Sequence, residues 1–181
     1  MTDLLIERAR RGDSEAFVAL IEERQVAMTR VATAILGNET DVADALQETL
    51  VSLWRELPHL RSVDRFPAWA DTVLINACRL VLRRRGRTRL RQMALPATDV
   101  AAGFPSLANE GLETEIVDRD AFGRAFETLP TDARAILVLH HLEGQSVARI
   151  ATVLGIAVGT VKSRLFAARR ELERALTEEH R

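Results

Sequence analysis

The sequence predicts an all-α protein, with two small helical domains joined by a flexible linker. Apolar residues recur with the 3.6-residue period of a helix through most of the 181 residues. Tyrosine, which favours strands, is absent. Between the two periodic blocks, a stretch containing Pro96, Gly103, Pro105 and Gly111 has no clear period. These three observations favour two separate helical units over a single mixed fold.

Composition argues against several classes of protein. The 25 basic and 26 acidic residues nearly balance, so the chain as a whole is not a polycation. The single cysteine, Cys78, excludes a disulfide framework and a cysteine-based metal site. No apolar run reaches the ~18 residues of a membrane span, and the charged start is no signal peptide. Catalytic signatures such as HExxH and GxSxG are also missing. We therefore expect a cytoplasmic protein that is not an enzyme, with no catalytic residue, metal or cofactor and no membrane insertion.

The first domain is expected to span residues 1–91 and to contain three long helices. Their boundaries follow from local signals for capping and termination. These signals are an N-cap at Asp13, a stop at Gly37-Asn38, a helix from about Asp41 to Leu57 ended by Pro58, and a helix start near Pro67. The third helix is expected to continue into the arginine run that follows it.

Residues 92–117 are expected to form the linker. The stretch between Gln92 and Val117 carries four acidic residues and no basic one. At full extension this segment reaches ~85 Å, at ~3.3 Å per residue. The linker is therefore acidic and long enough to separate the two domains widely.

The second domain is expected to span residues 118–181 and to end in a helix-turn-helix. Pro130 breaks its first helix, and Thr131 or Asp132 is the expected cap of the next. A short helix capped by Ser146, a turn opening with Gly155 and a long helix from Val158 then follow. This order predicts that the long helix lies in a DNA major groove.

The outward positions of that long helix are polar, basic or aromatic. Its inward positions carry apolar residues at helical spacing. The outward residues are Thr160, Lys162, Ser163, Arg164, Phe166, Arg169 and Arg170. Small residues at the start, including Gly159, allow close approach to the phosphate backbone. The alternative interpretation is a helical hairpin with a solvated basic face.

A second basic feature is the run from Arg79 to Arg91, with seven arginines in thirteen residues and no acid. Such a run is a typical phosphate-binding surface, although a solvated helix end has the same composition. Trp54 and Trp69 lie near a polar loop upstream of the run. Each tryptophan could belong to the apolar stripe that faces the core, and each could instead stack on an unpaired base.

An acidic face lies on the helix expected from Asp41. Asp44, Gln47 and Glu48 share its outer side at i, i+3, i+4 spacing. Acids close to a basic DNA site would weaken DNA binding. We therefore expect this face to meet a basic protein partner.

Four stretches, in this order, resemble the extracytoplasmic-function (ECF) group of sigma-70-type sigma factors. They are GDSEAF at 12–17, DVADALQETLVSLW at 41–54, FPAWADTVLINACRLVLRRR at 66–85, and the segment from Leu129 to Leu172. The resemblance implies a bacterial transcription initiation factor with sigma region 2 first and region 4 last. Its implied partners are core RNA polymerase, promoter DNA and, as a candidate, an anti-sigma factor. It also implies that the free chain is held inactive, by an anti-sigma factor or by packing of its two domains.

The resemblance implies a role for each candidate residue. Region 2 would bind the clamp helices of the β′ subunit and hold the melted −10 strand, while region 4 would bind the β flap and the −35 element. The implied polymerase-binding residues are Asp44, Gln47 and Glu48. The implied −10 residues are His59, Arg61, Ser62, Trp69, Asn76, Arg83, Arg84 and Arg85. The implied −35 residues are Arg149, Thr160, Lys162, Ser163, Arg164, Phe166 and Arg169.

The chain departs from the family pattern at several positions. Ala70-Asp71 follows Trp69, where an aromatic or aliphatic pair is frequent, and an acid there would repel phosphate if it faced DNA. Arg149 stands where a glutamate often completes a capping box, and is instead free to contact phosphate. Ala157 replaces the usual serine cap of the recognition helix.

Two other functions fit the second domain alone. A DNA-binding regulator would share the helix-turn-helix but would carry an α/β receiver or ligand domain in the first ninety residues. An RNA-binding or protein-interaction module would not bind −35-type duplex separately. The all-helical first half with an acidic docking face favours the sigma factor.

Overall fold

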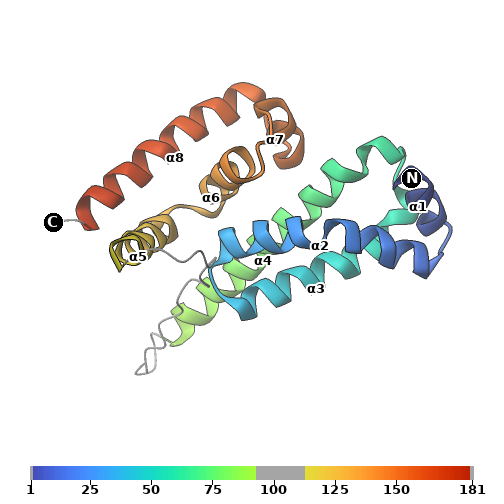
Figure 1. Cartoon of the computed structure of the whole chain (residues 1–181), viewed down its shortest axis with the longest axis horizontal. Coiled ribbons are helices and arrows are strands. Elements are labelled where there is room, and N and C mark those ends of the chain that lie inside the picture. The colour runs from blue at the N-terminus through green and yellow to red at the C-terminus, as the bar shows by residue number, and fades with distance from the viewer. Residues whose placement is uncertain (1, 93–112, 180–181) are drawn as a thin grey trace.

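The computed structural model describes residues 2–92 and 113–179, which form helices and no strand. Two domains are present, α1 to α4 and α5 to α8 (Figure 1). The first consists of α1 (Thr2–Arg10), α2 (Ser14–Leu36), α3 (Glu39–Glu56), the 3-10 turns η1 (Leu57–His59) and η2 (Val63–Arg65), and α4 (Phe66–Gln92). The second consists of α5 (Glu113–Thr128), α6 (Thr131–Leu137), the π-helical turn η3 (Val138–Leu142), α7 (Val147–Leu154) and α8 (Val158–Glu179).

Helices α2, α3 and α4 lie alongside one another and bury a shared apolar core (Figure 1). Leu20, Leu53 and Phe66 are fully buried in it. The predicted caps of α2 are confirmed. The Asp13 carboxylate accepts a hydrogen bond of 3.0 Å from the Ala16 N–H, and Gly37 ends the helix at φ 79°. That left-handed conformation is available to glycine at little cost.

The second domain is built around α8. Helices α5, α6 and α7 all contact it, and Ile136, Ile150 and Val161 are completely buried between them. The predicted helix-turn-helix is confirmed. Ser146 Oγ accepts a 3.2 Å bond from the Arg149 N–H at the start of α7, and Gly155 adopts φ 66° in the turn before α8.

The two domains pack against each other, with α7 and η3 on α4 and α2. Thr72 Oγ1 donates to the Val153 carbonyl at 3.0 Å. The Arg30 guanidinium pairs with Glu143 at 2.7 Å. Most polar contacts across this interface are therefore ion pairs and hydrogen bonds to carbonyls.

Three local predictions differ from the structure. Helix α1 was not predicted, because it is short and highly charged, and the packing of Ile6 and Ala9 stabilises it. Thr131 and Asp132 do not cap α6. Pro130 is its N-cap residue, with no side-chain bond, and Asp132 pairs with arginines instead.

Helix α5 begins at Glu113, so the last five residues of the expected linker are helical. The helix-breaking residues of that linker all precede Glu113, and no proline follows until Pro130. The remaining linker residues, 93–112, lie outside the described part of the chain.

Candidate nucleic-acid interface

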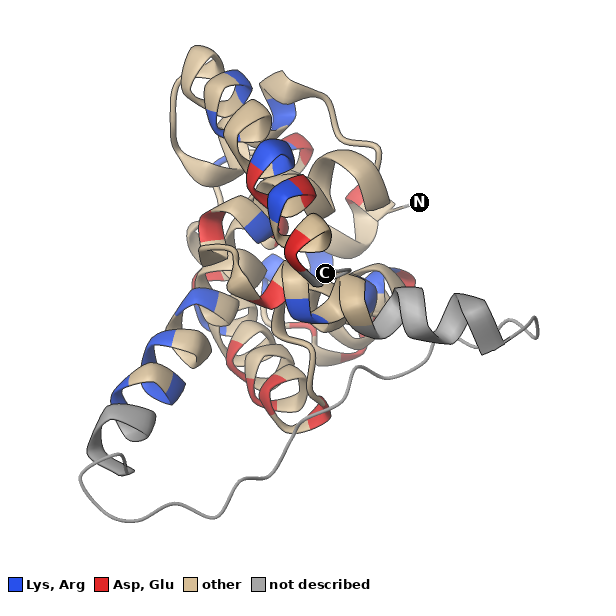
Figure 2. Ribbon diagram, turned by 90° about the vertical axis from the view of Figure 1, so that its left-hand side faces the viewer, with Lys and Arg blue, Asp and Glu red and all other residues tan. Residues whose placement is uncertain are grey.

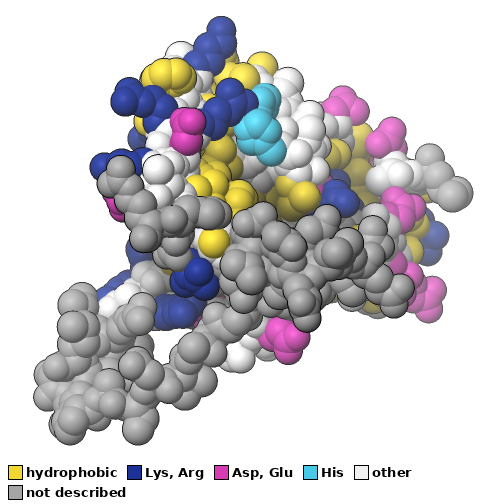
Figure 3. All heavy atoms as spheres, turned by 60° about the vertical axis from the view of Figure 1, so that its left-hand side comes forward, with side chains coloured by type: hydrophobic (Ala, Val, Ile, Leu, Met, Phe, Trp, Pro, Cys, Tyr) yellow, Lys and Arg dark blue, Asp and Glu magenta, His cyan; other side chains and the backbone are white. Residues whose placement is uncertain are grey.

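The N-terminal half of α8 presents its predicted contact residues to the surface. Lys162, Ser163 and Arg164 are exposed, and Thr160 is half-buried. The Phe166 ring is 64% exposed, with the Arg170 guanidinium 5.8 Å from its centroid. Basic and apolar side chains gather on the upper part of the molecule, where Figure 1 has α7 and α8 (Figure 3). The surface therefore combines cationic donors with an apolar ring, as a major-groove surface requires.

All three arginines predicted for the −35 element have partners within the protein. Arg164 pairs with Asp132 at 3.2 Å, and Arg149 pairs with Asp71 at 3.2 Å. Arg169 donates to His141 Nε2, with its Nε at 3.2 Å. Partial burial, with the charges of Arg169 and His140, lowers the pKa of His141. The neutral imidazole is thereby kept as an acceptor for Arg169.

The arginine run lies on the projecting end of α4. Basic residues follow one another along this end in Figure 2. Arg83 and Arg84 are exposed, and Arg85 is half-buried, with its guanidinium 3.3 Å from the Asp41 carboxylate. The predicted continuation of the third helix into the run is confirmed, because α4 reaches Gln92. A helix end that projects from the core exposes its cations to a polyanion.

The other residues predicted for the −10 strand surround the start of α4. His59 and Arg61 are exposed, and Ser62 is half-buried. The half-buried Trp69 ring lies 6.0 Å from the buried Phe66 ring, so it packs on the core with part of its surface free. Asn76 is exposed and accepts a 2.9 Å bond from Arg79.

The acidic face of α3 is exposed as predicted. Asp44, Gln47 and Glu48 all face solvent. Val51 continues the same row and is 55% exposed, which periodicity did not single out as a surface feature. Trp54, for which a core stripe and base stacking were both open, is 41% exposed, and its ring packs against Phe17 with centroids 5.0 Å apart. The face is therefore acidic at one end and apolar at the other, a composition suited to a protein partner.

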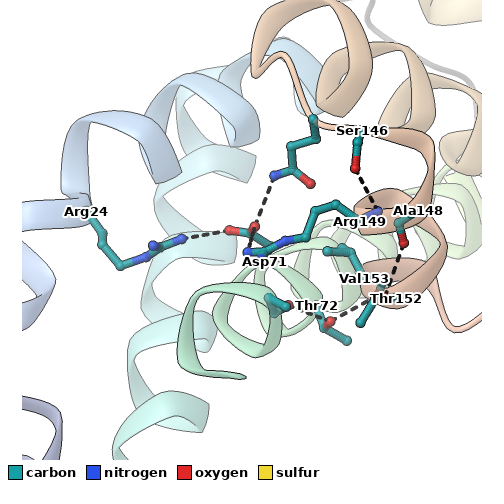
Figure 4. Close-up of polar contacts among 10 residues, drawn as sticks. Arg24, Asp71, Thr72, Ser146, Ala148, Arg149, Thr152 and Val153 are labelled. Atoms are coloured by element: carbon teal, nitrogen blue, oxygen red, sulfur yellow. Dashed lines mark hydrogen bonds and ion pairs between the residues drawn. The ribbon is translucent and has the colours of Figure 1, made fainter. Parts of the chain in front are cut away.

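Asp71 lies between the two domains in this structure rather than on the exposed surface of region 2. Its carboxylate accepts from Arg24 at 2.7 Å, from Gln145 at 3.0 Å and from Arg149 at 3.2 Å (Figure 4). Only 15% of its side chain is exposed. Two of these three donors belong to the second domain, and sequence reasoning did not predict this cluster.

Two family models match the chain over these surfaces. Sigma-70 region 2 matches residues 20–88, and Sigma-70 region 4 matches residues 119–172. The chain is 31% identical to the RNA polymerase sigma-H factor of Pseudomonas aeruginosa, over 95% of this chain and 92% of that protein. It is 30% identical to the ECF RNA polymerase sigma-E factor of Salmonella typhimurium, over 96% and 93% of the two chains. This chain belongs to the ECF group of the sigma-70 family.

Two solved structures have the same architecture as this chain. One is CnrH in complex with the cytosolic domain of CnrY, with 27% identity, a TM-score of 0.67 and 97% of each chain covered. Another is the sigma factor RpoE in complex with the anti-sigma factor NepR from Bartonella quintana, with 25% identity and a TM-score of 0.68 over 89% of this chain and 96% of that chain. The sigma factor described here therefore acts in promoter-specific initiation of transcription, and partnership with RNA polymerase fits its family.

In the described residues of this sigma factor, no single helix is long and apolar enough to cross a membrane. Helices α7 and α8 pass that test only together, by length and composition, and they meet at 102°.

The one cysteine of the chain, Cys78, is fully buried in the region 2 core, and burial raises its pKa to about 12. A thiol held neutral in this way is a poor nucleophile.

Proposed function

We propose that region 4 reads the −35 element with the N-terminal half of α8. Lys162, Ser163, Arg164 and Phe166 would meet base edges, and Thr160 and Arg169 would lie beside them. Arg149 would contact the phosphate backbone from α7. The exposure of this row above a fully buried Val161 supports the assignment, because a recognition helix must project its polar side while its apolar side holds it on the domain.

Region 2 would hold the melted −10 strand. The loop residues His59, Arg61 and Ser62 would contact the strand, with Trp69 and Asn76 beside them. The free part of the Trp69 ring suits stacking on an unpaired base. Arg83, Arg84 and Arg85 would neutralise the neighbouring phosphates, each adding ~0.7 to the salt slope on single strands and ~0.9 on duplex.

The observation that carries the core-polymerase assignment is the exposed acidic row on α3. Asp44, Gln47 and Glu48 would bind the clamp helices of the β′ subunit, and region 4 would bind the β flap. Opposite charge on two surfaces of one domain fits two different partners, a basic protein surface and an anionic nucleic acid. The proposed domains are residues 1–91 and 118–181, with 92–117 as the acidic linker, whose first residue ends α4 and whose last five residues begin α5.

An anti-sigma factor is the third proposed partner. CnrH, which has this architecture, was solved with the cytosolic domain of CnrY, and the sigma factor RpoE was solved with the anti-sigma factor NepR. The likeness extends over both domains, with 97% of this chain covered in the first case. We place the protein in the cytoplasm, where core polymerase and promoters are found, without membrane insertion and without covalent chemistry, metal or cofactor of its own.

Co-elution with sigma-free core RNA polymerase on a sizing column tests the proposal. The wild-type chain is expected to co-elute, and an Asp44→Arg/Glu48→Arg variant is expected to elute alone. The matched control, Glu22→Arg/Glu178→Arg, makes the same charge change at exposed positions outside the α3 face and should still co-elute. Equal binding by both variants would refute the assignment of the docking face.

A further inference from the structure

Asp71 of region 2 holds the face of region 4 that carries a proposed DNA contact. Its Oδ2 accepts from Gln145 and from the Arg149 Nη2, while its Oδ1 accepts from Arg24 of its own domain (Figure 4). The side chain is 15% exposed, so water screens these bonds less than it screens a surface ion pair. One carboxylate therefore joins helices α2 and α4 to the segment that begins the helix-turn-helix.

The Arg149 guanidinium has two alternative anionic partners, the Asp71 carboxylate and a DNA phosphate. In the structure it binds the Asp71 carboxylate, and on DNA it would bind a phosphate oxygen. Both acceptors use the same planar N–H donors of the guanidinium. In the closed arrangement the Arg149 Nε is buried and the Nη2 is bound to Asp71, so the Nε–Nη2 pair of donors is closed to a phosphate.

The surroundings of this contact are suited to release. A cavity of about 240 Å³ lies between the domains, lined by both of them. Its lining includes the charged side chains of Arg24, Asp71, Glu143 and Arg149. The rest of the lining is largely apolar, but a cavity of this size with charged groups on its wall has room for water beside them. Interfaces between domains that open and close are typically rich in polar contacts, as this one is.

The dimensions of the promoter require opening. The −10 and −35 elements are separated by nearly two turns of DNA, ~70 Å at ~35 Å per turn. In the structure the Arg149 guanidinium, a proposed −35 contact, lies 3.2 Å from the carboxylate of Asp71, which is two residues from the proposed −10 contact Trp69. The packed arrangement therefore cannot place both domains on their elements at once.

We propose that Asp71 is an intramolecular latch, which keeps region 4 packed on region 2 by binding Arg149 in place of a DNA phosphate. The proposal rests on the proposed function, because that function gives Arg149 its role on DNA. The proposal gives Asp71 a function, at a position where the family pattern often has an apolar residue. Closure and phosphate binding by Arg149 are then mutually exclusive states of one chain.

The first test uses no DNA. Small-angle X-ray scattering of the full-length chain compares wild type with Asp71→Asn, an isosteric change that removes the charge. Asp71→Asn should raise the radius of gyration, because loss of one charged acceptor shared by three donors weakens the closed state about tenfold. Arg149→Ala, on the surface of α7, should open the chain as well. Glu22→Gln, an exposed change of equal charge, should stay as compact as wild type.

The second test measures affinity for a random-sequence 30-base-pair duplex at low salt. A phosphate contact is independent of sequence, so this probe reports it directly. Asp71→Asn should bind about tenfold more tightly than wild type, since the competent fraction sets the apparent affinity. Arg149→Ala should open without this gain, and Glu22→Gln should bind nearly as wild type does.

The possible failures are distinct. If both Asp71→Asn and Arg149→Ala stay compact, the latch is refuted whatever the DNA result. If Asp71→Asn opens but binds duplex no better than Glu22→Gln, competition for Arg149 is refuted. If no variant binds duplex in either state, the proposed DNA-binding function fails, and the scattering result still decides whether Asp71 closes the chain.

Discussion

Replacing Arg134 with methionine removes a guanidinium that binds carbonyls at the C-terminal ends of two helices, one in each domain. Its Nε donates to the Leu129 carbonyl at 3.0 Å, and its Nη2 donates to the Glu127 carbonyl at 3.2 Å, both at the end of α5. Its Nη1 donates across the interface to the Ile35 carbonyl at 2.9 Å, near the end of α2. These carbonyls belong to helix C-termini, where a cation is favourable.

The expected cost follows from those three bonds. The bonds to Leu129 and Ile35 are partly buried, and the bond to Glu127 is exposed. At roughly 1–1.5 kcal/mol for each buried bond and less for the exposed one, Arg134→Met should lower the free energy of unfolding by about 2–4 kcal/mol. For a chain of this length the midpoint temperature should fall by roughly 5–15 °C.

Urea denaturation followed by the helical circular dichroism signal measures this change. Arg134→Lys should lose most of the same stability, because an ammonium on a flexible stem cannot reach all three carbonyls together. Arg61→Met, at an exposed position of the first domain, serves as the control and should stay within about 0.5 kcal/mol of wild type. An Arg134→Met variant as stable as this control would refute the reasoning, since water would then satisfy the three carbonyls equally well.

Three further outcomes are expected. A Cβ at Gly159 would meet no atom within 4 Å, so Gly159→Ala should keep or raise the thermal midpoint. Gly159→Leu should weaken duplex binding, because its larger side chain would crowd a DNA phosphate. Equal affinity of the two variants for duplex would argue against close approach of the DNA backbone to Gly159. Because the pKa of folded His141 lies below its usual 6.5, the unfolded state takes up the proton first, and His141 destabilises the fold as pH falls from 6.5 through the folded value. Protonated His141 cannot accept from Arg169, so duplex affinity should rise in that range, and His141→Ala should reduce this rise. Cys78, with its pKa raised to about 12 by burial, should not react with an aromatic disulfide reagent at pH 8 until urea unfolds the chain.

Local sequence signals predicted most of the helices. Asp13, Gly37 and Ser146 act within three or four residues of their own positions, and each cap was found where its residue type predicted it. The buried and exposed sides of α8 followed from periodicity alone. Such features depend on residues that neighbour each other in the chain, so one sequence is enough to predict them.

Contacts between distant segments were not predictable in this way. Asp71 and Arg149 are 78 residues apart, and no spacing rule relates a residue of α4 to one of α7. Helix α1 owes its stability to packing rather than to its own propensity. Asp132 was predicted as a cap because of its residue type, but the structure gives it Arg79 and Arg164 as partners, and a charged pair competes with a local cap. These features depend on how the two domains meet.

Mapping of transcript start sites tests the central claim most directly. Sigma-free core RNA polymerase would be mixed with the purified chain and with fragmented genomic DNA of its host, and the 5′ ends of the transcripts would be sequenced. The account predicts starts that core polymerase alone does not make, preceded by two shared sequence blocks near −10 and −35. A Lys162→Ala variant should relax the block near −35 and leave the other in place. Starts identical to those of core polymerase alone would contradict the account.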